Sequence, residues 1–63
     1  MKNVLKEIRK EKRMTQEELA AKSNVSRPTI VAIENDEDYN ATVETLVKLS
    51  DALETPIDKI FLL

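Results

Sequence analysis

The chain has 63 residues with 10 basic and 12 acidic side chains, which predicts one small domain with a formal net charge of −2. It contains neither cysteine nor histidine, which excludes disulfides, thiolate nucleophiles, zinc sites built from these residues and imidazole acid–base catalysis. A chain this short buries only a small core, so a large substrate cavity is not expected. Function must then reside on a surface or in pairing with another chain.

No run of apolar residues approaches the length of a membrane span or of a signal-peptide core. We therefore expect a cytoplasmic protein that contacts no membrane and uses no cofactor or metal, although a cysteine-free chain is compatible with any compartment. No small-molecule effector is indicated. A carboxylate-based enzyme is disfavoured, because helix capping explains Glu17 and Glu18 and a solvated loop explains the acidic run at residues 36–38.

The charge is divided unevenly along the chain. Residues 1–33 carry eight basic and four acidic side chains, a net charge of +4, whereas residues 34–63 carry two basic and eight acidic ones, a net charge of −6. The first half is suited to face phosphates while the second faces water or a partner. An ordinary solvated surface explains the same pattern equally well.

An amphipathic first helix is predicted over residues 3–12, because Val4, Leu5 and Ile8 fall on one face. Arg13 interrupts this pattern, so the helix is expected to end before it. The charged residues between the apolar positions are expected to face water.

A second helix is predicted from Gln16 to about Ser23. Thr15 and Glu18 have the spacing of a capping box, in which each side chain bonds the backbone amide of the other. Asn24 is suited to turn the chain out of this helix, because asparagine tolerates the left-handed conformation better than most residues.

A third helix is predicted to follow Ser26, its N-cap, and to reach about Glu34. Pro28 fits the first turn of this helix, where a missing N–H costs nothing. Glu34 is expected to pair with a basic side chain of the first helix.

An acidic, polar stretch at residues 35–41 is predicted to be a loop. Thr42 is suited to cap a fourth helix with a broad apolar stripe, and Thr55 with Pro56 at the first helical position opens a short fifth helix. No segment has a strand pattern. The sequence therefore predicts an all-α fold, a compact five-helix bundle that forms a single domain over residues 1–63.

The second and third helices are joined by about three residues, so they must cross steeply. The side chains expected to lock this crossing as core are Leu19, Val25, Ile30 and Ile33. Three motifs of this segment are informative: Thr15-Gln16-Glu17-Glu18-Leu19-Ala20, Val25-Ser26-Arg27, and Thr29-Ile30 with Ile33-Glu34-Asn35. Together they resemble the helix-turn-helix of the Cro/C1 phage-repressor family, also called the XRE family.

The resemblance covers nearly the whole chain, because residues 5–9 and 56–61 resemble the first and last helices of that family. It implies a bundle of the phage-repressor DNA-binding type with the helix-turn-helix at its second and third helices. It also implies a sequence-specific transcriptional regulator, most simply a repressor, that reads a palindromic operator in the major groove of double-stranded DNA and is not an enzyme. Such a protein would work in a prokaryotic cytoplasm or on phage DNA, associated with the nucleoid.

The resemblance implies that the third helix lies in the major groove. The groove-facing positions are Ser26, Arg27, Pro28, Thr29 and Ala32. Arg27 would bind guanine O6 and N7 or else a phosphate, Thr29 would contact a base or the backbone, and Val31 is ambiguous between core and groove. Pro28 and Ala32 offer only apolar contact where the family often has polar side chains. Thymine-methyl contact and DNA shape would then carry more of the specificity, or the specificity would be modest.

The resemblance also implies phosphate contacts. Gln16 matches a position that commonly holds a phosphate beside the free amides of a helix start; the alternative is a solvent-exposed first-turn residue. Asn40 and Thr42 flank a helix start whose amides often contact a phosphate, but Ala41 replaces the usual proline between them. Arg13 stands where glycine is common and adds positive charge near the expected DNA face.

The apolar end of the chain suggests a homodimer interface, which similar proteins use to place two recognition helices about one DNA turn apart. Its candidate members are Ile57, Ile60, Phe61, Leu62 and Leu63. The alternatives are that these side chains fold back onto the first helix as core, or that the chain was cut here from a longer one. The alternative function is a protein-interaction module on the same fold, such as an antitoxin that neutralises a partner protein through the acidic second half.

Overall fold

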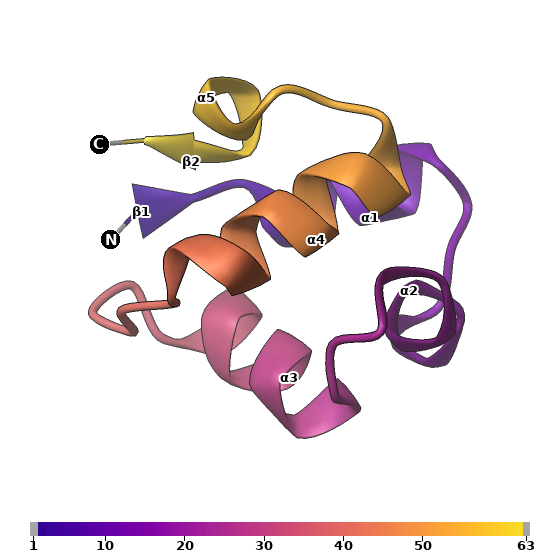
Figure 1. The fold of residues 1–63 in the computed structure, drawn as a ribbon, viewed down its shortest axis with the longest axis horizontal. Coiled ribbons are helices and arrows are strands. Elements are labelled where there is room, and N and C mark those ends of the chain that lie inside the picture. Colours follow the sequence, from indigo (N-terminus) through magenta and orange to yellow (C-terminus); the bar gives the residue numbers. More distant parts are fainter. Residues whose placement is uncertain (1, 63) are drawn as a thin grey trace.

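The computed structural model describes residues 2–62, and in that part of the chain five helices and two short strands are found (Figure 1). In chain order they are β1 (Lys2–Asn3), α1 (Leu5–Glu11), α2 (Gln16–Ser23), α3 (Arg27–Asn35), α4 (Val43–Leu53), α5 (Ile57–Ile60) and β2 (Phe61–Leu62). The predicted five-helix, all-α architecture is confirmed. None of the described helices is long and apolar enough to cross a membrane.

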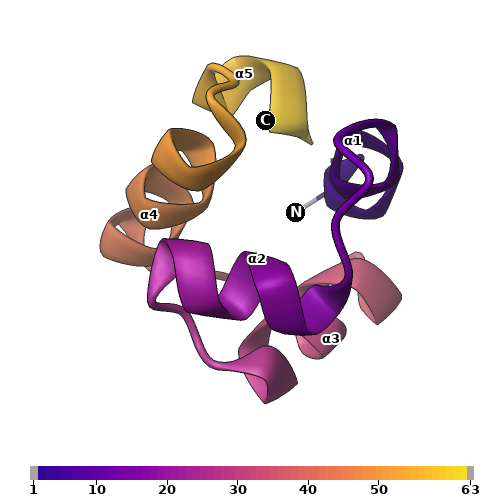
Figure 2. The same cartoon turned by 90° about the vertical axis from the view of Figure 1, so that its right-hand side faces the viewer.

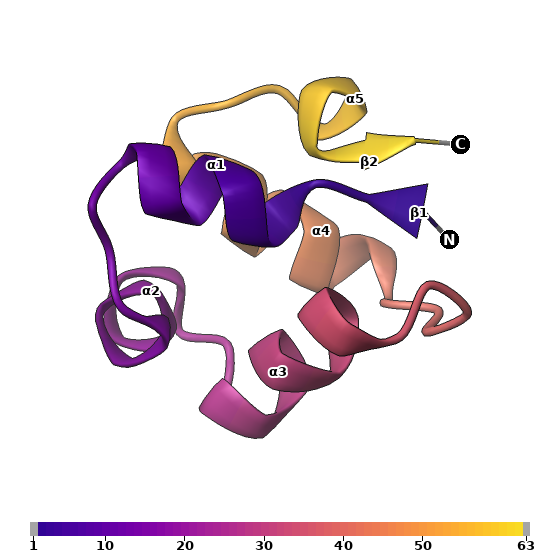
Figure 3. The same cartoon turned by 180° about the vertical axis from the view of Figure 1, so that it is seen from behind.

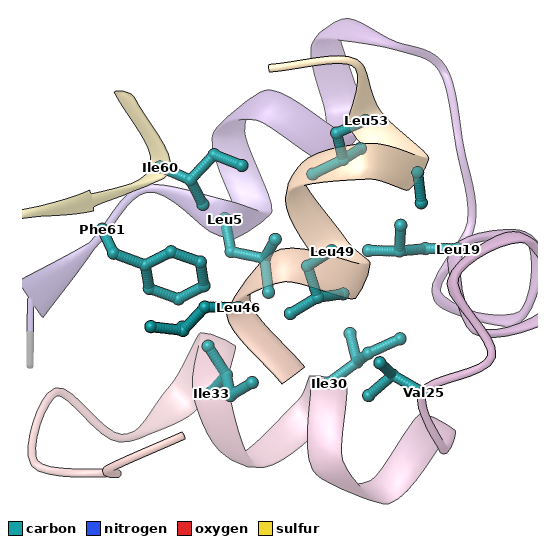
Figure 4. Close-up of a cluster of buried hydrophobic side chains, with 11 residues drawn as sticks. Leu5, Leu19, Val25, Ile30, Ile33, Leu46, Leu49, Leu53, Ile60 and Phe61 are labelled. Carbon is teal, nitrogen blue, oxygen red and sulfur yellow. The ribbon is translucent and has the colours of Figure 1, made fainter. Parts of the chain in front are cut away.

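The helices surround one hydrophobic core, which Figure 4 shows from inside the bundle. α4 packs against α2 and α5, and α3 packs against α1 and α2. The buried apolar side chains are Leu5, Leu19, Val25, Ile30, Ile33, Leu46, Leu49, Ala52, Leu53, Ile60 and Phe61. The four residues expected to lock the helix-turn-helix are among them, so that prediction is confirmed.

Three of the four predicted N-caps are confirmed, because each cap side chain accepts a hydrogen bond from an amide in its own first turn. At α2 the capping box is complete: Thr15 Oγ1 accepts from Glu18 N at 3.0 Å, and Thr15 N donates to Glu18 Oε1 at 2.9 Å. Ser26 Oγ accepts from Thr29 N at 3.4 Å at the start of α3.

The third of these caps is Thr42, which accepts from Thr45 N at 3.2 Å at the start of α4. The cap predicted at Thr55 is wrong. The structure places Pro56 at the N-cap of α5, and the Thr55 hydroxyl donates to the Leu53 carbonyl at 2.8 Å instead. The hydroxyl thereby satisfies an unpaired carbonyl at the end of α4 rather than an amide of α5.

Among the residues that the structure describes, three adopt the left-handed conformation, each where the chain leaves a helix. Arg13 has φ 58°, Asn24 has φ 61° and Glu54 has φ 50°. The left-handed turn predicted at Asn24 is therefore confirmed. Arg13 and Glu54 carry a side chain that crowds the backbone there, which costs about 1–2 kcal/mol at each position.

The two strands correct the expectation that the chain has none. β1 and β2 pair antiparallel, with Lys2 opposite Leu62 and Asn3 opposite Phe61, and Figure 3 shows them side by side where both ends of the chain lie. Because Asn3 belongs to the sheet, α1 begins at Leu5 and not at residue 3. Strands of two residues have no periodicity to detect, and their pairing depends on bringing the two ends of the chain together.

The apolar end of the chain folds back into the core. Ile60 is 0% exposed and Phe61 is 2% exposed, and Figure 4 shows both among the side chains of α1 and α4. The prediction that these two residues form a dimer interface is therefore corrected, because their side chains are already buried within a single chain. Leu62 remains 52% exposed, and Leu63 lies outside the described residues.

Candidate nucleic-acid interface

α2 and α3 form two short helices that cross steeply around a tight turn. α2 is seen end-on in Figure 1, where α3 lies in the plane, and from the side in Figure 2. In the turn Asn24 is left-handed, and the buried hydroxyl of Ser23 accepts a hydrogen bond from Val25 N at 3.2 Å. Leu19 and Ile30, both 0% exposed, pack in the core beneath the two helices. The crossing is therefore held by apolar packing and by local hydrogen bonds.

α3 is amphipathic, with Ile30 and Ile33 buried on one face. The opposite face carries a shallow, open hollow lined by Arg27, Pro28, Val31 and Ala32. Three of the five predicted groove-facing residues thus meet at one place, together with Val31, whose position the sequence left open. The half-buried Val31 contributes to this outward surface as well as to packing.

The polar groups at the start of α3 are already engaged within the chain. The hydroxyls of Ser26 and Thr29 are hydrogen-bonded to each other at 2.8 Å. Arg27 Nη1 lies 3.6 Å from Oε2 of Glu17 on α2, with the two side chains 56% and 64% exposed. Exposed ion pairs of this kind are worth little, so the guanidinium can exchange Glu17 for another acceptor at small cost.

A buried network ties α1, α2 and α3 together beneath this surface. Arg9 donates to Glu34 twice, from Nε to Oε2 at 2.7 Å and from Nη2 to Oε1 at 3.2 Å, and its Nη1 donates to the Met14 carbonyl at 2.7 Å. Gln16 Nε2 donates to Glu34 Oε1 at 3.1 Å. Among the described residues no buried side-chain nitrogen or oxygen lacks a partner.

The opposite charges of Arg9 and Glu34 stabilise each other in this network. The hydrogen bonding that Arg9 donates to Glu34 raises the pKa of Arg9 above its ordinary value, and this effect outweighs the desolvation that lowers it. The side chains of Arg9 and Glu34 are 9% and 1% exposed. The prediction that Glu34 pairs with a basic residue of the first helix is confirmed, and the partner is Arg9.

The predicted phosphate contacts fall at the starts of two helices. Gln16 is the first residue of α2 and is half-buried by its bond to Glu34, and Arg13 is exposed in the turn that leads to it. Asn40 and Thr42 are exposed before α4. The Thr42 hydroxyl also donates to Thr45 Oγ1 at 3.0 Å, so it is occupied by the helix start in this structure.

A sequence model of the helix-turn-helix family matches residues 5–60, which includes all five helices. The chain belongs to this helix-turn-helix family, of the Cro/C1 or XRE type. Helix-turn-helix proteins of this family bind DNA and are not enzymes, which confirms the predicted class.

Two relatives of this helix-turn-helix chain are similar over nearly its whole length. The immunity repressor protein of Bacillus phage phi105 is 41% identical over 56 residues, which are 89% of this chain and 38% of that protein. An uncharacterized helix-turn-helix-type transcriptional regulator of Methanocaldococcus jannaschii is 40% identical over 62 residues, which are 98% of this chain and 92% of that protein. The chain thus spans well under half of the phage repressor and nearly all of the archaeal regulator.

Two contacts made by the helix-turn-helix segment were not predicted from the sequence. Glu17 was assigned only to helix capping, and its approach to Arg27 joins helices whose relative placement no local pattern reveals. Arg9 was not singled out, although a signal existed. It follows Ile8 and lies four residues after Leu5, so it falls toward the buried side of α1.

Proposed function

We propose that this chain binds double-stranded DNA sequence-specifically and represses transcription, with α3 in the major groove of a palindromic operator. The observation that carries the proposal is the outward face of α3, where Arg27, Pro28, Val31 and Ala32 form an open surface on a helix whose other face is locked in the core. Ser26, Arg27, Pro28, Thr29 and Ala32 would contact the groove.

Phosphate contacts would fix the register of α3 on the duplex. We assign them to Gln16 and Arg13 beside the start of α2, and to Asn40 and Thr42 beside the start of α4. The excess of basic side chains in residues 1–33 supports the assignment of Gln16 and Arg13, because a net charge of +4 there attracts phosphates although the whole chain carries −2. The acidic second half would face water or a partner.

The names of the two relatives favour this function over the protein-interaction module. One is named a repressor and the other a transcriptional regulator, and the matching region of each contains the helix-turn-helix. The mechanism we propose is steric: the protein occupies a short operator and blocks polymerase. Such a protein would act in a prokaryotic or phage-infected cytoplasm, associated with the nucleoid.

A homodimer would explain how so small a domain reads a site of useful length. With Ile60 and Phe61 in the core, we assign the interface to Ile57, which is half-buried, to Leu62, which is 52% exposed, and to Leu63. Pairing through this end would place two copies of α3 about one DNA turn apart.

The test is selection of binding sites from a random duplex library, followed by affinity measurements on the selected sequence at several salt concentrations. We expect a two-fold palindrome with half-sites about 10 base pairs apart and an affinity that falls steeply as salt rises. Arg27→Ala should weaken binding by about tenfold or more. Lys59→Ala, which removes an exposed charge from α5, is the matched control and should leave binding unchanged. Failure to enrich any sequence at low salt would contradict the proposal.

A further inference from the structure

We infer that the hollow on α3 receives the 5-methyl group of a thymine, so that one position of each half-site is selected for thymine by apolar contact. The inference rests on the proposed function and deepens it, because it names the chemical group that α3 reads. It also chooses among the alternatives that the sequence left open, which were thymine-methyl contact, DNA shape and modest specificity.

The first step is the chemistry of the hollow. Pro28, Val31 and Ala32 present only carbon atoms to it, and Arg27 adds the stem of its side chain. A polar base edge placed there would lose water without gaining a hydrogen bond, which is unfavourable. Among the groups that bases expose in the major groove, the thymine methyl is the apolar one. The hollow is therefore matched to thymine.

The second step is that the two hydroxyls beside the hollow are partly engaged within the chain. The Ser26 and Thr29 hydroxyls bond each other at 2.8 Å, and Ser26 Oγ also accepts from Thr29 N at 3.4 Å to cap α3. Their mutual bond uses one of the two hydroxyl hydrogens, so at most one remains free to donate to a base while the cap of α3 stays intact. Arg27 is the one side chain lining the hollow that carries a charge and can turn toward a base or phosphate.

The third step is charge. The first turn of α3 contains no acidic residue, and Arg27 in this turn lines the hollow. Glu17 on α2 lies 3.6 Å from Arg27, but this pair is exposed and can be exchanged for a phosphate at small cost. The amide end of a helix and a guanidinium both favour an anion, so a phosphate backbone is the complementary neighbour for this rim. An apolar hollow with a cationic rim fits a methyl-bearing base edge between phosphates better than it fits an apolar protein surface.

The experiment uses the duplex selected above and replaces each thymine in turn by uracil, which lacks the 5-methyl group but keeps the same hydrogen-bonding edge. We expect one thymine per half-site at which uracil weakens binding by about fourfold, the factor that burial of one methyl group provides. Uracil at the remaining thymines should have little effect. Restoring the methyl at the sensitive position should restore affinity.

Two variants test whether the sensitive thymine contacts the hollow. Val31→Thr and Ala32→Ser each bring a hydroxyl into its lining, and in both the penalty for uracil should largely disappear. Val47→Thr makes the same change at a residue of α4 that is 41% exposed and far from α3 in the sequence, so it should keep the full penalty. Unfolding curves of the three variants identify any loss of binding that comes from lost stability.

The outcomes separate this inference from the proposed function. If a palindrome is selected but no thymine is sensitive to uracil, the inference is overturned and the proposed function stands. If one thymine is sensitive but both variants keep the penalty, the methyl is read elsewhere and the assignment to the hollow is wrong. If no sequence is selected, the proposed function and this inference fall together.

Discussion

Arg9 and Glu34 lie 25 positions apart in the chain and form a two-point ion pair beneath the crossing of α1 and α3. The pair is almost fully shielded from water, with side chains 9% and 1% exposed. Gln16, a proposed phosphate contact, is held by the same carboxylate. One buried acidic residue therefore fixes both the packing of the bundle and the position of Gln16 at the start of α2.

Glu34→Gln should lower the free energy of unfolding by about 3 kcal/mol, because it leaves the Arg9 guanidinium buried without its counter-charge. Chemical denaturation measures this loss. Glu44→Gln is the control, because it removes an exposed pair with Lys48 at 3.1 Å and should cost less than about 0.5 kcal/mol. Equal losses in the two variants would show that burial does not increase the contribution of the Arg9–Glu34 pair to the free energy of unfolding. The double change Arg9→Met with Glu34→Leu should recover much of the stability.

The capping box at α2 makes stability depend on pH. The pKa of Glu18 lies below its ordinary value of 4.5, first because the Thr15 amide donates to its carboxylate and second because of the Thr15 side chain. A lowered pKa in the folded state means that the unfolded chain takes up the proton more readily. The contribution is therefore present above pH 4.5 and is lost as pH falls through the lowered pKa.

Thermal unfolding as a function of pH tests this contribution. Glu18→Gln should be less stable than the parent at neutral pH, and the difference should shrink as the solution is acidified below 4.5. Glu17→Gln, at the neighbouring position, removes a charge without touching the capping box, so its stability difference from the parent should not show this dependence on pH. In Thr15→Ala, an NMR titration should find the pKa of Glu18 closer to its ordinary value. A pKa that does not move would contradict the role of the Thr15 side chain.

Arg13→Gly should separate stability from DNA binding. Arg13 has φ 58°, which glycine adopts without strain, so we expect the free energy of unfolding to rise by about 0.5–1 kcal/mol. The same change removes a proposed phosphate contact, so affinity for the selected duplex should fall and its dependence on salt should become shallower by about one unit of slope.

Lys12→Gly is the matched control for this prediction. Lys12 has φ −82°, so glycine relieves no strain there and should not stabilise the protein, although it removes one positive charge from the same turn. If Arg13→Gly binds DNA like the parent, the proposed phosphate contact of Arg13 is wrong. If it is less stable than the parent, the strain argument is wrong.

Leu62→Glu should shift the proposed homodimer toward monomer, because it places a charge on an exposed residue of β2 that we assign to the interface. Sedimentation equilibrium over a range of concentrations measures the change in dimer affinity. Val47→Glu introduces the same charge on the outer side of α4 and should leave dimerisation unchanged. Loss of affinity in both variants, or in neither, would argue against this assignment.

The sequence determined those features that depend on residues close together in the chain. The complete capping box of Thr15 and Glu18, the caps at Ser26 and Thr42, and the left-handed turn at Asn24 were all predicted, because each forms within about one helical turn. The family resemblance extended this local information to the whole bundle.

Only the tertiary structure decided the contacts between distant segments. Which basic residue pairs with Glu34, and whether Ile60 and Phe61 face a second copy or the core, depend on how α1, α3 and the chain ends pack together. Apolar periodicity shows that a side chain must leave water, but burial within one chain and burial against another satisfy that requirement equally. The other helices pack so that the core accommodates Ile60 and Phe61, and this arrangement exists only in the folded bundle.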